Sequence, residues 1–449
     1  MIGPLLIFPL LIAVCLGALW RPAIGVIGYY GFVTLEPEWN WRWSLPADFQ
    51  YQKYIAAATL LGLLVTGLRG NRWTNTATLA CVALWLFLGL AFVSAQSSLL
   101  PAASAHYLDL LWKIILMATV AIHGLDSPGW ITGALWTAML AQGYNAYQIT
   151  LHYLQTGVSL YAHRNWGFKG DNNGYSIFTI PVIAISASLM FGSRPLWQKL
   201  LAGAVLTLQM HQIMLLESRG CMLGGLAMIP LWLWYMPKTT WNWSAVATAL
   251  ILGSVLAGPS VVKEFSSSFK PEGERDSSAE SRFDLWKAGW AITKDYPLLG
   301  VGPWAGQKLV PRYLGLATDA KGLHNVIFEV STGCGVPALL FYLTFFAVGW
   351  WIAVRGLRRR KQQPLPEWAE TAYLAAGSGL VGYFVSSMFS SGAALETSYL
   401  LVSIGLAASL VLEQQGQELS AMPLDEHEDS DAAPDADNHA PLIPDRGVL

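Results

Sequence analysis

Groups suited to acid–base and anion chemistry gather in one polar segment, 262–335, of an otherwise apolar chain. Arg282 lies near its middle, and His324, Asn325 and Glu329 lie near its end. An imidazole titrates near pH 6.5, so His324 can take a proton from a hydroxyl at neutral pH and is our candidate general base. Asn325 and Glu329 could orient this base or bind a sugar. A lone loop histidine is also commonly a structural hydrogen-bond partner, and the pattern alone leaves both interpretations open.

Two arginines, Arg219 and Arg282, are candidates for binding a phosphate. Arg219 follows Glu217 and Ser218 at a point where one helix should end and the next begin. A guanidinium there can form a forked contact with a phosphate, and a helix N-terminus favours anions. Arg282 opens an amphipathic stretch. The alternatives are an interfacial arginine paired with Glu217 and a charged surface helix in which Arg282 lies beside Asp284.

A third group of cations lies in the loop 157–174, which is rich in turn-forming residues. Arg164 and Lys169 could contact a diphosphate or a sugar there, although an ordinary polar loop would have the same composition. The sequence has no His-Glu-x-x-His motif, no cysteine pair with metal-ligand spacing and no acidic cluster inside its predicted helices. Because a nucleotide-binding loop is absent too, we expect no metal, no cofactor and no nucleic-acid partner.

The elements that position these groups must be membrane helices. The chain has 449 residues, of which 54% are apolar and only 12% charged, and its mean hydropathy is +0.41. A soluble protein needs more charge than this, and about 20 apolar residues cross a bilayer as a helix. We predict an all-α polytopic membrane protein with twelve or thirteen transmembrane helices and one large extracytoplasmic loop that contains short helices. The candidate spans are 2–19, 23–35, 54–68, 76–95, 107–124, 130–151, 175–191, 200–216, 221–236, 245–261, 336–354, 372–389 and 399–412.

These spans divide the chain into four predicted parts. They are an N-terminal transmembrane bundle (1–261), the extracytoplasmic loop (262–335) with short helices at 281–294 and 302–313, C-terminal transmembrane helices (336–412) and a disordered acidic tail (413–449). The tail holds ten acidic residues and one arginine.

The basic cluster 355–361 has five cations and should face the cytoplasm, which places the loop on the opposite side. No ATP is available outside the cytoplasm, so a reaction there needs an activated donor. Cys221 and Cys334 fall near that same outer face. A disulfide between them is possible, but buried free thiols are the better expectation.

Taken together, these features resemble the O-antigen ligase and polymerase superfamily over about residues 76–412. The resemblance rests on Ser218-Arg219-Gly220 at an outer helix end, Arg282-x-x-x-Trp286 opening a large outer loop, the turn Tyr296-Pro297-Leu298-Leu299-Gly300-Val301-Gly302, and His324-Asn325-x-x-x-Glu329 before the next helix. The run Arg21-Pro22-Ala23-Ile24-Gly25, with Pro37 and the alanines at 56–58, is similar to the branch associated with exosortase systems, which glycosylates proteins.

The resemblance implies a glycosyltransferase at the outer, periplasmic face of a bacterial inner membrane. Its donor would be a polyprenyl-diphosphate-linked glycan, and its acceptor a hydroxyl on a lipid core, a protein or another glycan. His324 would be the base, and Arg219 with Arg282 would hold the diphosphate, with Arg164 or Lys169 helping. Two alternatives remain: a polymerase of repeat units in the same superfamily, and a transporter. Transporters place polar groups near the membrane midplane and often contain inverted repeats, and this sequence has neither feature.

Overall fold

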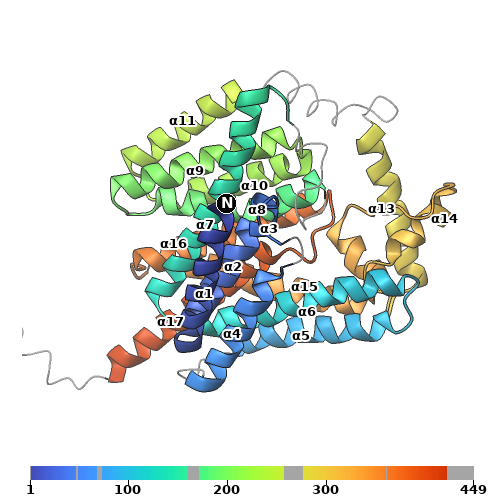
Figure 1. Ribbon diagram of the computed structural model, residues 1–449, viewed down its shortest axis with the longest axis horizontal. Helices are drawn as coiled ribbons and strands as arrows, with labels where there is room; N and C mark the ends of the chain where they lie inside the picture. The colour runs from blue at the N-terminus through green and yellow to red at the C-terminus, as the bar shows by residue number, and fades with distance from the viewer. Residues whose placement is uncertain are drawn as a thin grey trace, which may run out of the picture. The chain divides into compact units, whose positions relative to one another are not determined.

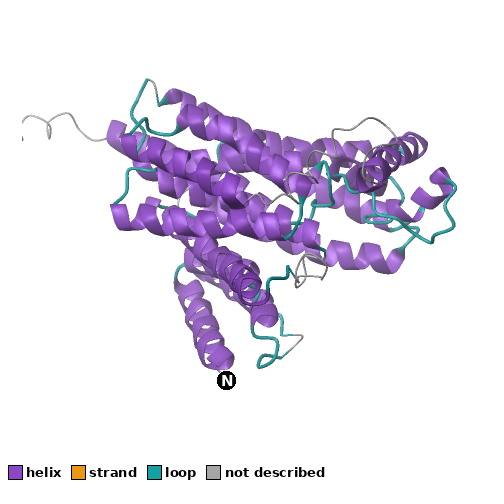
Figure 2. Cartoon of the chain, turned by 90° about the horizontal axis from the view of Figure 1, so that it is seen from above, coloured by secondary structure: helices purple, strands orange, loops and turns teal. Residues whose placement is uncertain are grey.

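The chain is built from helices. A computed structural model describes residues 2–46, 49–67, 73–159, 171–256, 277–360 and 362–421, and within these ranges every regular element is a helix (Figure 2). The all-α prediction is therefore confirmed. By contacts the chain divides into a unit of residues 1–411 and a second unit, Leu412–Leu449. Arg164, Lys169 and the tail beyond residue 421 lie outside the described residues.

Within the described residues, every predicted span overlaps a helix (Figure 1). The helices are α1 (Ile2–Trp20), α2 (Pro22–Leu35), α3 (Pro37–Asn40), α4 (Tyr51–Thr66), α5 (Asn75–Ala95), α6 (Pro101–Gly124), α7 (Pro128–Thr156), α8 (Asn172–Phe191), α9 (Leu196–Leu215), α10 (Arg219–Tyr235), α11 (Thr240–Leu256), α13 (Ser277–Asp295), η3 (Gly306–Lys308), α14 (Val310–Leu314), α15 (Val326–Arg359), α16 (Glu367–Ser387) and α17 (Glu396–Ala421).

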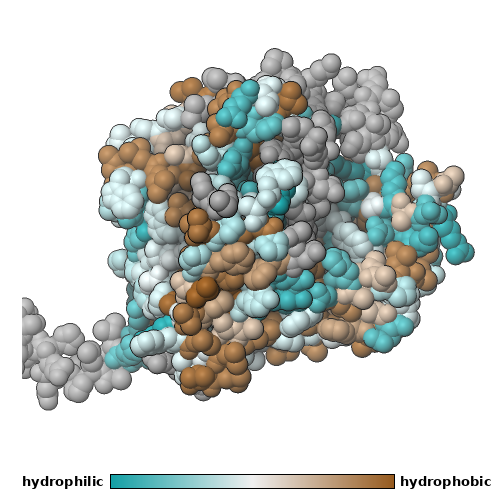
Figure 3. Space-filling view, viewed as in Figure 1, coloured by the Kyte–Doolittle hydropathy of each residue, from teal (hydrophilic) through white to brown (hydrophobic). Residues whose placement is uncertain are grey.

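The helices have the length and composition of a polytopic membrane protein. Within the described ranges, six of them are long and apolar enough to cross a bilayer, namely α1, α5, α6, α8, α15 and α17. The others are shorter or less apolar, so the total of twelve or thirteen spans stays a prediction. Exposed leucines, such as Leu5 on α1 and Leu64 on α4, give these helices an apolar outer surface (Figure 3).

Helix α8 forms the centre of the bundle, because all its side chains from Gly174 to Phe191 are buried. A helix that is apolar on all sides must be enclosed by others, and α8 packs against α9, α10 and α16. Its N-terminus is capped by Asp171, whose carboxylate accepts the N–H of Gly174 at 2.8 Å. The central position of α8 fixes where Asp171 lies.

Helix α15 is kinked at Gly335, where φ is 86° and ψ is 169°. Pro337 has no N–H to donate to the carbonyl of Gly333, and that carbonyl instead accepts the N–H of Gly302 at 2.9 Å. In the same way, the carbonyl of Thr332 accepts the N–H of Val301 at 2.9 Å. The glycine turn that precedes the kink in the sequence is thus bonded directly onto it.

The two segments also meet at a third point, since the N–H of Val336 donates to the carbonyl of Pro297 at 2.8 Å. The predicted span beginning at residue 336 matches the part of α15 beyond the kink. The prediction that a loop runs to residue 335 was wrong in its last part, because α15 already begins at Val326. Buried contacts hold this first part of the helix in place, as described below.

The polar segment folds over a small apolar cluster of its own. Helix α13 covers the predicted 281–294, while the predicted 302–313 is divided into η3 and α14. Figure 1 shows α13 and α14 beside the ends of α5, α6 and α15. The cluster beneath them consists of Leu285, Ala288, Ile292, Val301, Ala305, Leu309, Val310 and Leu323.

Two smaller expectations have clear outcomes. The disordered tail was predicted from residue 413, but α17 continues to Ala421, so that boundary was placed too early. Cys221 and Cys334 are both buried and free, as expected, and form no disulfide.

Candidate active site

His324 occupies an unusual backbone position just before α15. Its φ is +47°, in the left-handed region. This backbone conformation costs a residue other than glycine roughly 1–2 kcal/mol. Asn325 next to it caps α15, because its side-chain oxygen accepts the N–H groups of Ile327 at 2.9 Å and Phe328 at 3.4 Å. The amide of Asn325 also donates to the carbonyl of Met388 at 3.2 Å, after the end of α16. These bonds hold His324 in place.

The imidazole of His324 packs over Gly322. A Cβ at residue 322 would lie 3.4 Å from Nε2 of His324, which is ordinary van der Waals contact with the ring. Burial lowers the pKa of His324 below its usual value near 6.5. The positive charges of Arg282 and Lys321 lower this pKa further, while Asp171 opposes them. The ring is therefore neutral at pH 7 and can accept a proton.

Arg282 lies on α13 and is partly exposed. The helix is fixed on one side by the apolar cluster and on another by Trp286, whose ring centroid lies 5.9 Å from that of Phe389. Arg282 acts electrostatically on both His324 and the Cys221 thiol. Arg282 therefore lies within electrostatic reach of both His324 and the start of α10.

Arg219 is the first residue of α10, whose start is held tightly against two other elements. Ser218 is buried and donates its hydroxyl to the side-chain oxygen of Asn173 at 3.0 Å, at the start of α8. A Cβ at Gly220 would come within 2.6 Å of Phe389, so only glycine permits this approach to the end of α16. Arg219 and Arg282 both make further interactions within the chain.

The structure therefore brings the predicted base and the predicted phosphate-binding arginines into one neighbourhood. His324 and the start of α10 each lie within electrostatic reach of both Arg282 and Asp171. These groups come from α8, α10, α13 and the residue before α15, which are far apart in the sequence. No one of these segments forms the site by itself.

Asn325 and Glu329 are engaged by the polypeptide rather than open to a ligand. Glu329 is 7% exposed, and one carboxylate oxygen accepts the N–H of Gly392 at 3.0 Å. The other oxygen accepts the hydroxyl of Tyr107 at 3.3 Å, on α6. Both side chains thus attach the start of α15 to neighbouring elements, while the roles expected for them, orienting His324 or binding a sugar, stay predictions.

Asp171 is an acidic group near His324 that the sequence analysis did not single out. Its acidic charge raises the pKa of His324, and its place at the N-cap of α8 fixes it there. The only sequence signal was an Asp-x-x-Gly start of a helix, which indicates a cap and nothing about a distant histidine. Among the described residues, no three His, Cys, Asp or Glu side chains lie together as a metal-binding group would.

Comparison with known families places this site inside a recognised domain. Residues 202–343 match the family model described as O-antigen ligase. The matched segment runs from α9 to beyond the kink of α15 and contains Arg219, Arg282 and His324. The resemblance to the O-antigen ligase and polymerase superfamily is confirmed for this segment. No curated protein matches the chain.

Proposed function

We propose that this membrane protein with an O-antigen ligase domain is a glycosyltransferase of the ligase type. It would transfer a glycan from a polyprenyl-diphosphate carrier to an acceptor hydroxyl on a lipid core, a protein or another glycan. The observation that carries the proposal is a half-buried His324 within electrostatic reach of Arg282, inside the matched segment. A base beside fixed positive charge is what a reaction with an anionic leaving group requires.

The reaction balances with these groups alone. The acceptor hydroxyl gives its proton to the imidazole of His324, and the acceptor oxygen bonds to the anomeric carbon of the donor sugar. The bond from that carbon to the diphosphate oxygen breaks, and the polyprenyl diphosphate leaves with one additional negative charge. Arg282 and Arg219 would meet that charge, since a guanidinium can bind phosphate oxygens in pairs.

The remaining groups would position these three. Asp171 would stabilise the imidazolium that forms on His324, because it acts electrostatically on that ring. Asn325 and Glu329 would hold the start of α15, as their hydrogen bonds indicate. Arg164 and Lys169 lie outside the described residues and stay additional candidates for the diphosphate or the sugar.

We place the reaction at the outer face of the cytoplasmic membrane. The basic residues Arg355, Arg358 and Arg359 follow the long span of α15 at the end away from His324, and such clusters face the cytoplasm. His324 then faces the outer compartment, where a lipid-linked diphosphate supplies the activation that ATP cannot. The donor would reach the site from the membrane, and the acceptor from that compartment or from the membrane.

The test is transfer by purified protein with a lipid-linked glycan and a chosen acceptor. His324→Ala should lower the transfer rate by about 10²–10⁴-fold, the usual contribution of a positioned base. His106→Ala is the matched control, because His106 is exposed at the start of α6. Normal transfer by His324→Ala, with melting like that of the wild type, would remove this base from the mechanism. Products that form a ladder on the carrier lipid would identify a polymerase instead of a ligase.

A further inference from the structure

A second polar pocket lies at the other end of the bundle from the candidate active site. The α5–α6 turn is bonded to the glycine turn near the site, as the N–H of Leu99 donates to the carbonyl of Val301 at 3.0 Å. Helix α6 has 24 residues and is therefore about 36 Å long. The pocket lies where α6 ends, about one membrane thickness away.

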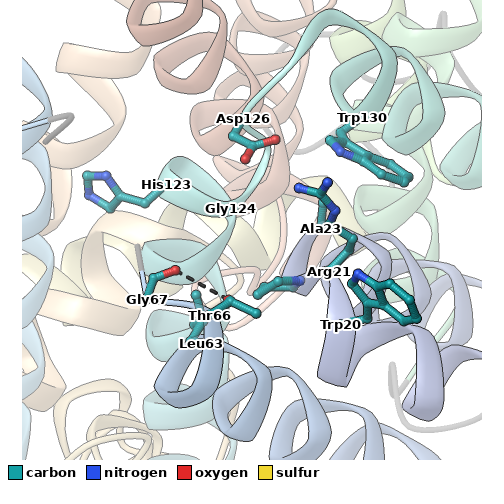
Figure 4. A pocket seen from close by; sticks show the side chains of 11 residues that line it. Trp20, Arg21, Ala23, Leu63, Thr66, Gly67, His123, Gly124, Asp126 and Trp130 are labelled. Atoms are coloured by element: carbon teal, nitrogen blue, oxygen red, sulfur yellow. Dashed lines mark hydrogen bonds between the residues drawn. The ribbon is translucent and has the colours of Figure 1, made fainter. Parts of the chain in front are cut away.

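Three chain segments form the pocket (Figure 4). The α1–α2 turn contributes Trp20 and Arg21, the end of α4 contributes Thr66, and the α6–α7 connection contributes Asp126, with Trp130 at the start of α7. Counted out to its open mouth, the space is about 370 Å³. This volume includes open solvent at the mouth, so a ligand bound there would be only partly enclosed.

Opposite charges face each other across this space. Figure 4 shows the guanidinium of Arg21 between the Asp126 carboxylate and the Trp130 ring. Within the part of the chain that the structure describes, the Arg21 side chain makes no hydrogen bond or ion pair. Asp126 interacts elsewhere in the chain as well, but a carboxylate has two oxygens and can accept several bonds. The pocket therefore offers a site for an anion beside a site for a cation.

Apolar side chains border the pocket on its outer side. Leu64 is 82% exposed and Val65 is 79% exposed, directly before Thr66 on α4, and Trp20 is 76% exposed. In a membrane helix such residues contact acyl chains, and tryptophan is enriched at the level of the headgroups. A ligand in this pocket would thus have its polar group inside and its hydrocarbon along α4.

We infer that this pocket binds a phosphoethanolamine group, the headgroup of a zwitterionic membrane lipid. Arg21 would bind the phosphate, and Asp126 would accept hydrogen bonds from the primary ammonium, with the ring faces of Trp20 and Trp130 adding attraction for that cation. A headgroup with negative charge only would meet repulsion from Asp126. A choline headgroup has no N–H to donate. The inference is independent of the glycosyl transfer.

The test is lipid binding by the full chain after delipidation in detergent, read by thermal melting and by native mass spectrometry. Phosphatidylethanolamine, phosphatidylcholine and phosphatidylglycerol with identical acyl chains are titrated separately. We expect the ethanolamine lipid to bind roughly tenfold more tightly than the other two, the effect of about one charge-assisted hydrogen bond. Equal binding of the ethanolamine and glycerol lipids would overturn the inference. Free phosphoethanolamine is titrated in parallel, and protection equal to that of the lipid would assign the pocket to a soluble ligand.

Variants link the preference to the pocket. Asp126→Asn should lose about tenfold in affinity for the ethanolamine lipid, so that this lipid binds like the choline lipid. Arg21→Ala should weaken the binding of all three lipids by about tenfold, because all three carry the phosphate. Arg42→Ala is the matched control, since Arg42 is also exposed and lies 4.7 Å from the rings of both Trp39 and Trp43, away from this pocket. An unchanged preference in Asp126→Asn would contradict the assignment. So would unchanged lipid affinity in Arg21→Ala, because Arg21 is exposed and its removal should not prevent folding.

Discussion

Gly335→Ala should be among the most destabilising single changes in this chain. The backbone there has φ 86° and ψ 169°, a region open almost only to glycine, and a side chain costs about 1–3 kcal/mol. The added Cβ would also lie 2.1 Å from the carbonyl oxygen of Leu298, so the turn 297–302 must move away. Three backbone hydrogen bonds join that turn to the kink, and each contributes about 1 kcal/mol. The expected loss is therefore about 5 kcal/mol.

A control substitution at Gly315 separates the cost of the backbone conformation from the cost of the clash with the turn. Gly315 also has a positive φ, +64°, but nothing lies within 4 Å of its would-be Cβ. Gly315→Ala should therefore cost only the backbone contribution, about 1 kcal/mol. Unfolding of both variants in mixed micelles, followed by circular dichroism over an SDS titration, gives the comparison. If the two variants unfold alike, the turn does not depend on the kink, and our account of α15 fails.

Three further predictions concern the site. Asp171 raises the pKa of His324, so Asp171→Asn should move the acid limb of the pH–rate profile to lower pH while keeping the helix cap. An acid limb at unchanged pH would show that Asp171 does not act on His324. Arg219→Lys and Arg282→Lys should retain part of the transfer activity, whereas the corresponding alanine variants should retain very little. The double alanine variant should have scarcely less activity than either single alanine variant. Additive losses would show that the arginines act at separate sites. A cysteine replacing Ser277 should react with an impermeant reagent in intact spheroplasts, and labelling only after lysis would reverse the orientation.

The sequence predicted the helices well because each apolar run is long enough to need a bilayer or a core. It missed the first part of α15, where Glu329, Ser331 and Thr332 make the run look polar. Tertiary contacts bury all three residues, and the bonds from Gly392 and Tyr107 accommodate the carboxylate of Glu329. Local pattern cannot reveal such partners.

For the candidate site too, the sequence could identify some of the residues and not others. His324 and Arg282 could be recognised because their residue types and flanking turns are unusual in a membrane chain. Asp171 and the segment after α16 could not, since only the packing of α8 and α16 around α10 brings them near His324. The hydrogen-bond partners of Asn325 and Glu329 could not be predicted either, because these partners lie on other elements.

The contacts between Ser218 and Asn173, between Asn325 and Met388, and between Glu329 and Gly392 each join the matched segment 202–343 to residues outside it. Exchange of that segment between related proteins would therefore replace one half of every such pair. A hybrid protein would keep His324, Arg219 and Arg282, but the residues that contact the segment around them would come from a different protein. Recombination during evolution, like chimera design in the laboratory, would then succeed most readily when α8 and the α16–α17 connection travel with the segment.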